Sequence, residues 1–247
     1  MITALLIGLA GGAASGLLGI GGGVVLVPLL VRYYRLPQKH AHGTSLAILV
    51  FTAIAAALTY RVSGTVSLAL AGWLALGATV AAPLGARLAG RMDNANLRRV
   101  FGFMLILVGF RLFLTHLPSG SWLRQPGLLG DGLAVGTGAL VGWLSGLLGV
   151  GGGTILVPIL TLLFGIEQHE AQAVSLFMII PTAIAGAWTH SKLGHVNFRI
   201  VPWIAAGSVV AAVGAAALAS HLPASTLRIA FGVLLVWVGW RATRVAR

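Results

Sequence analysis

Two stretches of the chain, each sixteen residues long, carry nearly the same glycine-rich sequence. Residues 15–30 read SGLLGIGGGVVLVPLL, residues 145–160 read SGLLGVGGGTILVPIL, and twelve of the sixteen positions are identical at an offset of 130 residues. Each copy lies inside a long apolar stretch, where a run of glycines interrupts regular structure and frees backbone amides. The duplication predicts two related halves, each with a break in an apolar segment.

Composition identifies the class of protein in which these breaks occur. Hydrophobic residues make up 58% of the 247 residues and charged residues only 8%, against roughly 25% charged residues in soluble domains. Runs without Asp, Glu, Lys or Arg occupy 1–31, 40–60, 62–86, 132–166, 171–191 and 200–227. Because a helix of about 20 apolar residues spans a hydrocarbon core of about 30 Å, the sequence predicts an all-α polytopic membrane protein.

The net charge of +12 fits this class better than it fits a nucleic-acid-binding protein. The basic residues stand singly or in small groups between the apolar runs, as at 32–39, 87–99 and 241–247. This spacing is typical of cytoplasmic loops that face anionic lipid headgroups. The absence of cysteine excludes disulfides, thiol catalysis and cysteine-based metal sites. No basic segment precedes the apolar run at Ile2, so we do not expect a cleaved signal peptide.

The repeat continues beyond the glycines at the same offset. Ser45-Leu46 corresponds to Ser175-Leu176, and Leu97-Arg98 corresponds to Leu227-Arg228. We therefore expect an N-terminal membrane repeat over residues 1–117 and a C-terminal membrane repeat over residues 128–247. The segment 118–127 between them is rich in Pro, Gly and Ser and is predicted to be a connecting loop.

Each half is expected to contain one glycine-broken segment and three transmembrane helices. The broken segments are predicted near 2–34 and 128–164, and the helices near 43–60, 66–90, 97–115, 171–190, 198–220 and 225–242. The run 132–166 would be about 52 Å long as one helix, at ~1.5 Å per residue. Because one crossing needs far less, the segment is predicted to fold back at its glycines as a hairpin, either re-entrant or a short helix pair.

The distribution of Lys and Arg favours the hairpin. If each broken segment crossed once, the 16 Lys and Arg residues would divide into eight on each side. If each folds back, twelve lie on one side and four, namely Arg61, Arg111, Arg124 and Arg228, on the other. Positively charged loops stay in the cytoplasm, so the second arrangement is preferred and both termini are expected there. The halves then have opposite topology, as in the inverted repeats of secondary transporters.

The glycines are the first candidates for a binding site. Each run precedes an apolar segment that can start a helix, and the first amides of a helix, with its dipole, attract anions. In the alternative interpretation the glycines only let helices pack closely. Matched breaks in both halves favour the site. The candidates are Gly19, Gly21, Gly22, Gly23, Gly149, Gly151, Gly152 and Gly153.

Hydroxyl side chains accompany the glycines in both halves. The candidates for donating to a bound oxyanion are Ser15, Thr44, Ser45, Ser145, Thr154 and Ser175. For any one of them, the alternative is a hydrogen bond to the backbone of its own helix or a helix cap. The recurrence of Ser45 as Ser175 strengthens the functional interpretation of this pair.

The charged residues favour an anionic substrate. The four acids, Asp93, Asp131, Glu167 and Glu170, all lie in loops or at segment ends. A carboxylate deep in the membrane, the usual proton relay of a cation carrier, is therefore not expected.

Three basic residues near the apolar runs are candidates for gating or coupling: Arg61, His190 and Lys192. They can attract anions, or they can be interfacial side chains that snorkel to the membrane surface. His190 alone is expected near the interior with a titration near neutral pH. The other histidines, including His40 and His42, are expected in loops, and no metal site is predicted.

No enzyme signature is present. Ser, His and Asp form no nucleophile motif, and the glycine runs match neither a P-loop nor a dinucleotide fingerprint. We therefore expect no catalytic residues and no cofactor.

The paired sequences GLLGIGGGVVLVPLL and GLLGVGGGTILVPIL resemble the signature of the TauE/SafE sulfite exporter family, also called the toluene-sulfonate uptake permease family. Similar segments include GTSLAI at 43–48, AVSLFMI at 173–179, APLGARLAGRM at 82–92 and GHVNFRIV at 194–201. The resemblance covers essentially the whole chain and implies transport of sulfite, thiosulfate, sulfonates or related small anions. Val174 stands where the first copy has Thr44, which suggests unequal half-sites.

These observations give the hypothesis of a secondary transporter in the cell inner (plasma) membrane. A small anion, namely sulfite, thiosulfate or an organosulfonate, would bind between the two glycine breaks at the midplane and cross by alternating access. An anion channel and a carrier of small carboxylates remain alternatives. The expected partners are the small anionic substrate and the lipid bilayer, without nucleic acid, and a homo-oligomer is left open.

Overall fold

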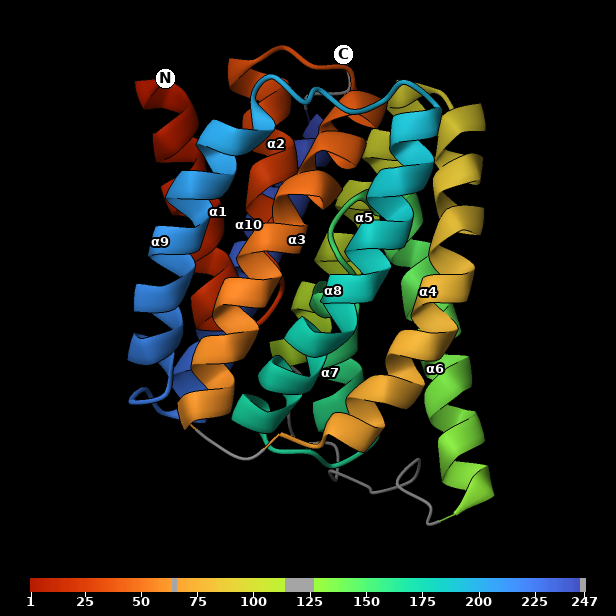
Figure 1. Ribbon diagram of the computed structural model, residues 1–247, viewed down its shortest axis with the longest axis vertical. Helices are drawn as coiled ribbons and strands as arrows, with labels where there is room; N and C mark the ends of the chain where they lie inside the picture. Colours follow the sequence, from red (N-terminus) through yellow and green to blue (C-terminus); the bar gives the residue numbers. More distant parts are fainter. Residues whose placement is uncertain (64–65, 114–126, 245–247) are drawn as a thin grey trace.

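Ten helices form the part of the chain that the computed structural model describes, residues 1–63, 66–113 and 127–244 (Figure 1). The first half contains α1 (Ile2–Leu18), α2 (Gly23–Tyr33), α3 (Gln38–Ser63), α4 (Leu68–Arg91) and α5 (Asn94–Phe113). The second contains α6 (Leu128–Leu148), α7 (Gly153–Leu162), α8 (Gln168–Lys192), α9 (Val201–Ala219) and α10 (Ala224–Arg244). No strand occurs in these ranges, so the all-α prediction is confirmed. The predicted connecting loop lies outside the described residues except for Gly127.

Each glycine-rich stretch separates two helices. The helix α1 ends at Gly19 and α2 follows Gly22, and both glycines have positive φ, 68° and 85°. Gly149 and Gly152 have equivalent φ values of 65° and 81° between α6 and α7. In Figure 1, α1 descends from the end that holds the N-terminus and α2 returns to it. The pair α6 and α7 enters from the other end of the molecule.

Six helices are long and apolar enough to cross a membrane, which confirms the multi-pass prediction: α3, α4, α6, α8, α9 and α10. Two details differ from the sequence-based expectation. The helix α5, predicted as a crossing near 97–115, is not among the six, and its sequence contains Arg98, Arg99 and Arg111. The helix α6, predicted as one arm of a hairpin, is long enough to cross by itself. The helices α1, α2 and α7 are shorter.

Stripes of glycine let two helix pairs pack in close contact. Gly8, Gly12 and Gly16 are spaced one turn apart on α1, and a Cβ at any of them would collide with a backbone oxygen of α9. Gly138, Gly142 and Gly146 of α6 face backbone oxygens of α4 in the same way. Small residues of this spacing allow close backbone approach in membranes, where the hydrophobic effect does not drive helices together.

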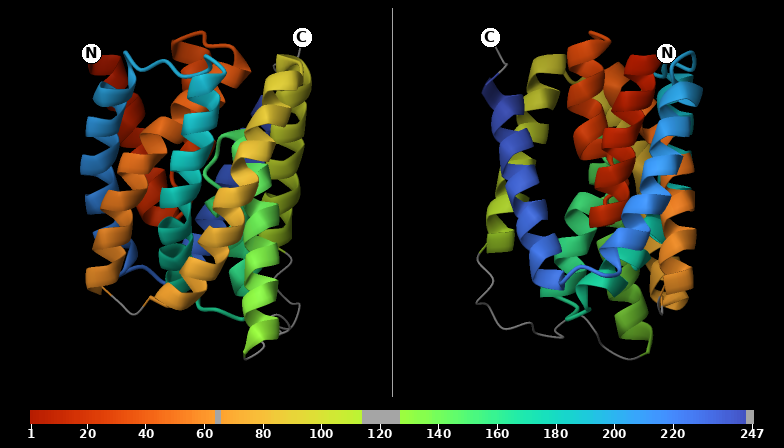
Figure 2. Two further views of the ribbon diagram at one scale, coloured as in Figure 1. Left: turned by 45° about the vertical axis from the view of Figure 1, so that its right-hand side comes forward. Right: turned by 90° about the vertical axis from the view of Figure 1, so that its left-hand side faces the viewer.

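The main helix contacts recur when the two halves are exchanged, although the contact of α1 with α2 has no equally extensive counterpart between α6 and α7. The contact of α1 with α9 corresponds to that of α6 with α4, and the contact of α3 with α9 corresponds to that of α8 with α4. The helices α3 and α8 contact each other in the middle, and α5 packs on α10 (Figure 2). Both glycine breaks lie next to the central helices α3 and α8.

Charge is distributed unevenly between the two ends of the molecule. Both termini, the α2–α3 connection and the α8–α9 connection lie at one end in Figure 1, together with the groups 32–39, 87–99 and 241–244. The other end holds the C-terminal end of α3 and the starts of α6, α8 and α10. In or directly beside these segments lie Arg61, Arg228 and three of the four acids, namely Asp131, Glu167 and Glu170. The basic groups that the sequence assigns to one side of the membrane therefore lie together.

Candidate functional site

The two glycine breaks touch each other. A Cβ added to Gly23 would lie 2.6 Å from the Cα atom of Val150, and one added to Gly153 would lie 2.8 Å from the Cα atom of Ile20. Only glycine permits so close an approach of two backbones at these positions. The structure therefore brings together the glycine-rich stretches that the sequence places 130 residues apart.

The breaks leave buried backbone amides without acceptors. Gly19 and Gly149 each donate to the carbonyl of the serine four residues earlier at 2.8 Å, and the next backbone hydrogen bonds along the chain are donated by the amides of residues 25 and 155. Within the described chain, no acceptor is found for the amides of 21–23 and 151–153, which belong to fully buried residues. These amides stand at the starts of α2 and α7, where the helix dipole attracts negative charge.

Five of the six predicted hydroxyls are buried and have no hydrogen-bond partner within the described residues. They are Ser15, Ser45, Ser145, Thr154 and Ser175, each 0% exposed. A buried hydroxyl without a partner costs roughly 1–3 kcal/mol. The sixth, Thr44, is also buried, but its oxygen accepts a hydrogen bond of 3.0 Å from the amide of Asn197. None of these five hydroxyls therefore makes the alternative hydrogen bond to the backbone of its own helix.

Three of these hydroxyls surround the second break. The Oγ atom of Ser175 lies 2.7 Å from the Cβ position of Gly153, and the Cβ atom of Ser145 lies 3.4 Å from that of Gly152. Thr154 follows directly as the second residue of α7. Two serines at the first break, Ser15 and Ser45, occupy the equivalent positions, but Val24 replaces the threonine.

The central helices carry apolar side chains to the same place. Leu49 and Ile179 lie one turn after Ser45 and Ser175, and both contact the Cβ positions of Gly21 and Gly151. One face of α3 and one face of α8 therefore cover both breaks, with a serine and a branched side chain from each.

Side chains from α3 and α8 hold the helix ends that lead into the breaks. In the first half, the hydroxyl of Tyr60 lies 2.9 Å from the carbonyl oxygen of Gly16, and Nε2 of Gln172 donates to the carbonyl of Leu17 at 3.2 Å. Such bonds satisfy carbonyls that lack intrahelical partners at a helix C-terminus. We call these side chains, with their counterparts in the second half, the carbonyl clamps.

The second half has the same clamps with different residues. Nε2 of His190 lies 3.0 Å from the carbonyl of Gly146, and Nδ1 of His42 lies 3.1 Å from that of Leu147. His190 corresponds to Tyr60 and His42 to Gln172 at the offset of 130. Each break is held by one clamp side chain from its own half and one from the opposite half, so the clamps connect the two repeats.

The sequence-based reasoning named His190 as a candidate, missed Tyr60 and Gln172, and misplaced His42. His42 was expected in a loop, which is wrong, because α3 begins at Gln38 directly after Pro37 and His42 is fully buried. His40 likewise lies in the first turn of α3, and His169 in that of α8. The offset of 130 is the signal that pairs Tyr60 with His190 and Gln172 with His42.

The three basic candidates lie in different surroundings. His190 is fully buried, and its Nδ1 has no partner within the described chain, so a role in coupling stays a prediction. Arg61 and Lys192 are exposed at opposite ends of the molecule, and the ammonium of Lys192 lies 5.0 Å from the Trp188 ring centre. Neither reaches the breaks, and the position of Lys192 on an aromatic ring is typical of an interfacial residue.

The site contains donors and no acids. None of the four acids is buried, and the described residues hold no group of three His, Cys, Asp or Glu arranged for a metal ion. His195 lies in the α8–α9 connection, outside the membrane-spanning helices, and is half-buried. Its pKa is lowered from the ordinary value by burial and, to a smaller extent, by the nearby His40 and Lys39.

Comparison with known proteins places this arrangement in a family. The profile of the family described as sulfite exporter TauE/SafE matches residues 1–112 and 134–247. The chain belongs to the sulfite exporter TauE/SafE family. The predicted resemblance is therefore confirmed over nearly the whole chain.

Curated relatives carry matching descriptions. The chain is 25% identical over 260 residues to the probable membrane transporter protein YunE of Bacillus subtilis, covering 96% of this chain and 95% of that protein. It is 27% identical over 263 residues to a probable membrane transporter protein of Haemophilus influenzae, covering 96% of each. No solved structure matches the chain. Family and relatives indicate a multi-pass membrane transporter rather than an enzyme.

Proposed function

We propose that the chain is a secondary transporter of a small oxyanion, namely sulfite, thiosulfate or an organosulfonate, which binds where the two glycine breaks meet. The observation that carries this proposal is a set of five buried hydroxyls around two helix starts, where neither the hydroxyls nor the amides have a partner among the described residues. Hydroxyls and amides donate to oxyanions, and both helix dipoles add positive potential. A bound anion would satisfy groups that are otherwise costly to bury.

The charges of the chain support an anion rather than a cation. No carboxylate is buried, whereas carboxylates within the membrane are the usual proton relays and cation partners of cation carriers. Sulfite, thiosulfate and sulfonates share three terminal oxygens on one sulfur, which suits a site with hydroxyl donors from five helices, α1, α3, α6, α7 and α8. The family description names sulfite, which supports this substrate class for the present chain.

The mechanism we propose is alternating access between inverted halves in the cell inner membrane. The end with both termini carries most of the basic residues, so we place it in the cytoplasm. The two hairpins enter from opposite ends and meet at their tips. Rocking of one half against the other about this contact would open the site to each side in turn, as in other carriers built from inverted repeats.

The test replaces hydroxyls at the site and matched hydroxyls beside it. Ser45→Ala plus Ser175→Ala removes two unpartnered donors. Thr52→Val plus Thr182→Val is the control, because these buried threonines lie on the same two helices at equivalent positions and bond to their own helix carbonyls at 3.1 and 2.8 Å. Since a hydrogen bond to a charged group is worth about 1.5–3 kcal/mol, we expect the serine pair to weaken anion affinity at least ~10-fold and the control to change it less than ~3-fold.

The measurement is uptake and counterflow in proteoliposomes with sulfite, thiosulfate, methanesulfonate and acetate. Equal affinity in the serine pair and the control would refute the proposed site. Acetate transport as good as that of the sulfur anions would identify a carboxylate carrier. Electrical currents far above carrier turnover, without counterflow, would identify a channel.

A further inference from the structure

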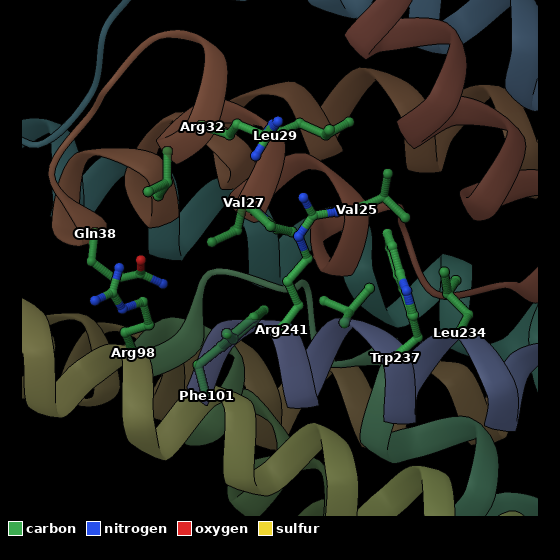
Figure 3. Close-up of a pocket in the computed structure, with 14 residues that line it drawn as sticks. Val25, Val27, Leu29, Arg32, Gln38, Arg98, Phe101, Leu234, Trp237 and Arg241 are labelled. Carbon is green, nitrogen blue, oxygen red and sulfur yellow. The ribbon is translucent and has the colours of Figure 1, made fainter. Parts of the chain in front are cut away.

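A cavity of about 290 Å³ lies between α2, α5 and α10, away from the contact of the glycine breaks (Figure 3). It is at the end of the molecule that holds both termini, because its lining includes Arg32 near the end of α2 and Arg241 near the end of α10. Its size is at the small end of ligand cavities, which suits a headgroup better than a whole lipid.

Positive charge lines this cavity without acidic residues. Three arginines, Arg32, Arg98 and Arg241, are among the lining residues, and no Asp or Glu is. In Figure 3, Arg241 extends from α10 toward α2 between Val25 and Val27, and Arg98 lies beside Gln38. Guanidinium groups match the oxygens of a phosphate, which arginine binds through two parallel hydrogen bonds.

The rest of the lining is apolar except for Gln38, and it continues onto the outer face of α10. Trp237 lines the cavity and is 51% exposed, and Val233 and Trp240 on the same helix are also about half exposed. Tryptophan beside arginine at a helix end is typical of the membrane interface. A vestibule for a water-soluble ion would not need such walls, whereas the first carbons of an acyl chain would pack against them.

We propose that this cavity binds the phosphate headgroup of an anionic phospholipid from the cytoplasmic leaflet. The proposal rests on the orientation proposed above, in which this end faces the cytoplasm. Basic pockets between transmembrane helices on that side are suited to anionic headgroups. The phosphate would lie among Arg32, Arg98 and Arg241, and the acyl chains would leave along Trp237 and the outer face of α10.

The position of the cavity gives the lipid a link to the transport site. Val25 is the third residue of α2, whose N-cap is Gly22 in the first break, so a bound lipid would pack on one arm of the first hairpin. The equivalent place beside the second hairpin, between α7, α10 and α5, keeps an arginine opposite Arg98 and Arg241, namely Arg228 and Arg111, but differs at two other positions. Leu162 stands where the first half has Arg32, and Leu107 stands opposite Trp237 at the offset of 130. The lipid would therefore stabilise one hairpin and not the other.

The test is a thermal-unfolding titration of the purified full chain in detergent with dioctanoyl phosphatidylglycerol, using dioctanoyl phosphatidylcholine as the neutral comparison. Arg32→Gln plus Arg241→Gln removes two charges from the cavity. Arg91→Gln plus Arg199→Gln removes two charges at the same end of the molecule from residues that do not line the cavity. We expect phosphatidylglycerol to raise the unfolding temperature, with a midpoint concentration at least ~10-fold higher in the cavity variant and unchanged in the control.

Two further variants separate loss of lipid binding from poor folding and from loss of the transport site. Trp237→Leu, which introduces the residue found at the equivalent position 107 of the first half, is expected to weaken phosphatidylglycerol binding severalfold even if the arginine variant folds poorly. Ser45→Ala plus Ser175→Ala is expected to bind phosphatidylglycerol normally, so failure of the transport site would not be mistaken for failure of the lipid site. Equal stabilisation by both lipids, or an unchanged midpoint in the cavity variant, would overturn the proposal. So would tighter binding of methanesulfonate or inorganic phosphate at the same arginines, which would assign the cavity to a soluble anion.

Discussion

The two glycine breaks have the same backbone and different side chains. Their glycines have nearly equal positive φ values, and each break contacts the other through the same positions, 23 and 153. The carbonyl clamps differ completely: Tyr60 and Gln172 serve the first break, and His190 and His42 serve the second. The comparison teaches that the backbone path is the shared requirement, while the chemistry around it has diverged between the halves.

The divergence makes the second break the richer donor site. It has three unpartnered hydroxyls, because Thr154 replaces Val24. In the first half the clamps also touch each other, since the hydroxyl of Tyr60 lies 3.0 Å from Oε1 of Gln172. We infer that the first break serves more as a fixed support and the second more as the place where the anion is held.

The largest expected difference concerns Gly22 and Gly152. Alanine at either position is strained by about 1–2 kcal/mol, because both have positive φ. A Cβ at Gly22 would also collide with the backbone carbonyl of Gly11, whereas one at Gly152 would meet only side-chain atoms of Val141, Met178 and Ser145 at 2.9–3.4 Å. We expect Gly22→Ala to abolish folded protein, and Gly152→Ala to lower the unfolding temperature by about 3–6 °C.

Yield of monodisperse protein on size exclusion, followed by thermal unfolding in detergent, measures this difference. Gly72→Ala is a suitable control, because its Cβ would meet no atom within 4 Å. Similar losses for Gly22→Ala and Gly152→Ala would show that the local strain, rather than the collision with Gly11, dominates.

The next effect tests the inequality of the donor sites. Thr154→Val removes a buried unpartnered hydroxyl at nearly constant volume, and we expect anion affinity to fall about 10-fold. Val24→Thr adds the same hydroxyl to the first break and is expected to leave affinity equal or slightly higher. Isothermal titration with sulfite checks both variants, and Thr154→Ser should retain most of the affinity. A loss in Thr154→Ser as large as in Thr154→Val would assign the effect to packing.

A smaller effect is expected from the carbonyl clamps. Tyr60→Phe leaves the buried carbonyl of Gly16 without its side-chain donor, which costs roughly 1–3 kcal/mol. His42→Gln introduces glutamine, the residue that serves the first break at the equivalent position 172. We therefore expect a cost in unfolding free energy below about 1 kcal/mol. Thermal unfolding should therefore separate the two variants by several degrees, and an equal or larger loss in His42→Gln would show that the clamps are not interchangeable.

The sequence predicts the breaks well and the clamps poorly, for a physical reason. Glycine runs within apolar segments act locally, so the hairpins and the hydroxyls beside them follow from the repeat itself. The clamps depend on long-range packing: Gln172 and His42 reach the hairpin of the opposite half, and no local pattern encodes which helix lies there. The α3 boundary was also misjudged, because charged and polar residues from Gln38 to His42 look like a loop until the helix is seen to begin after Pro37.

The smallest expected effect concerns His195, which lies at the basic end of the molecule, and the pH dependence of the unfolding temperature. The pKa of His195 is lowered by burial, by His40 and by Lys39, and the ring also lies 5.8 Å from that of His190. Because the folded state disfavours the protonated form, His195 contributes stability above the ordinary pKa of about 6.5, and this stability is lost as the pH falls below it. In His195→Gln the unfolding temperature should decline less between pH 7.5 and 5 than in the unaltered protein, by about one or two degrees. The difference is small because His195 is only partly buried, and identical slopes in the two proteins would show that His195 does not contribute to the pH dependence.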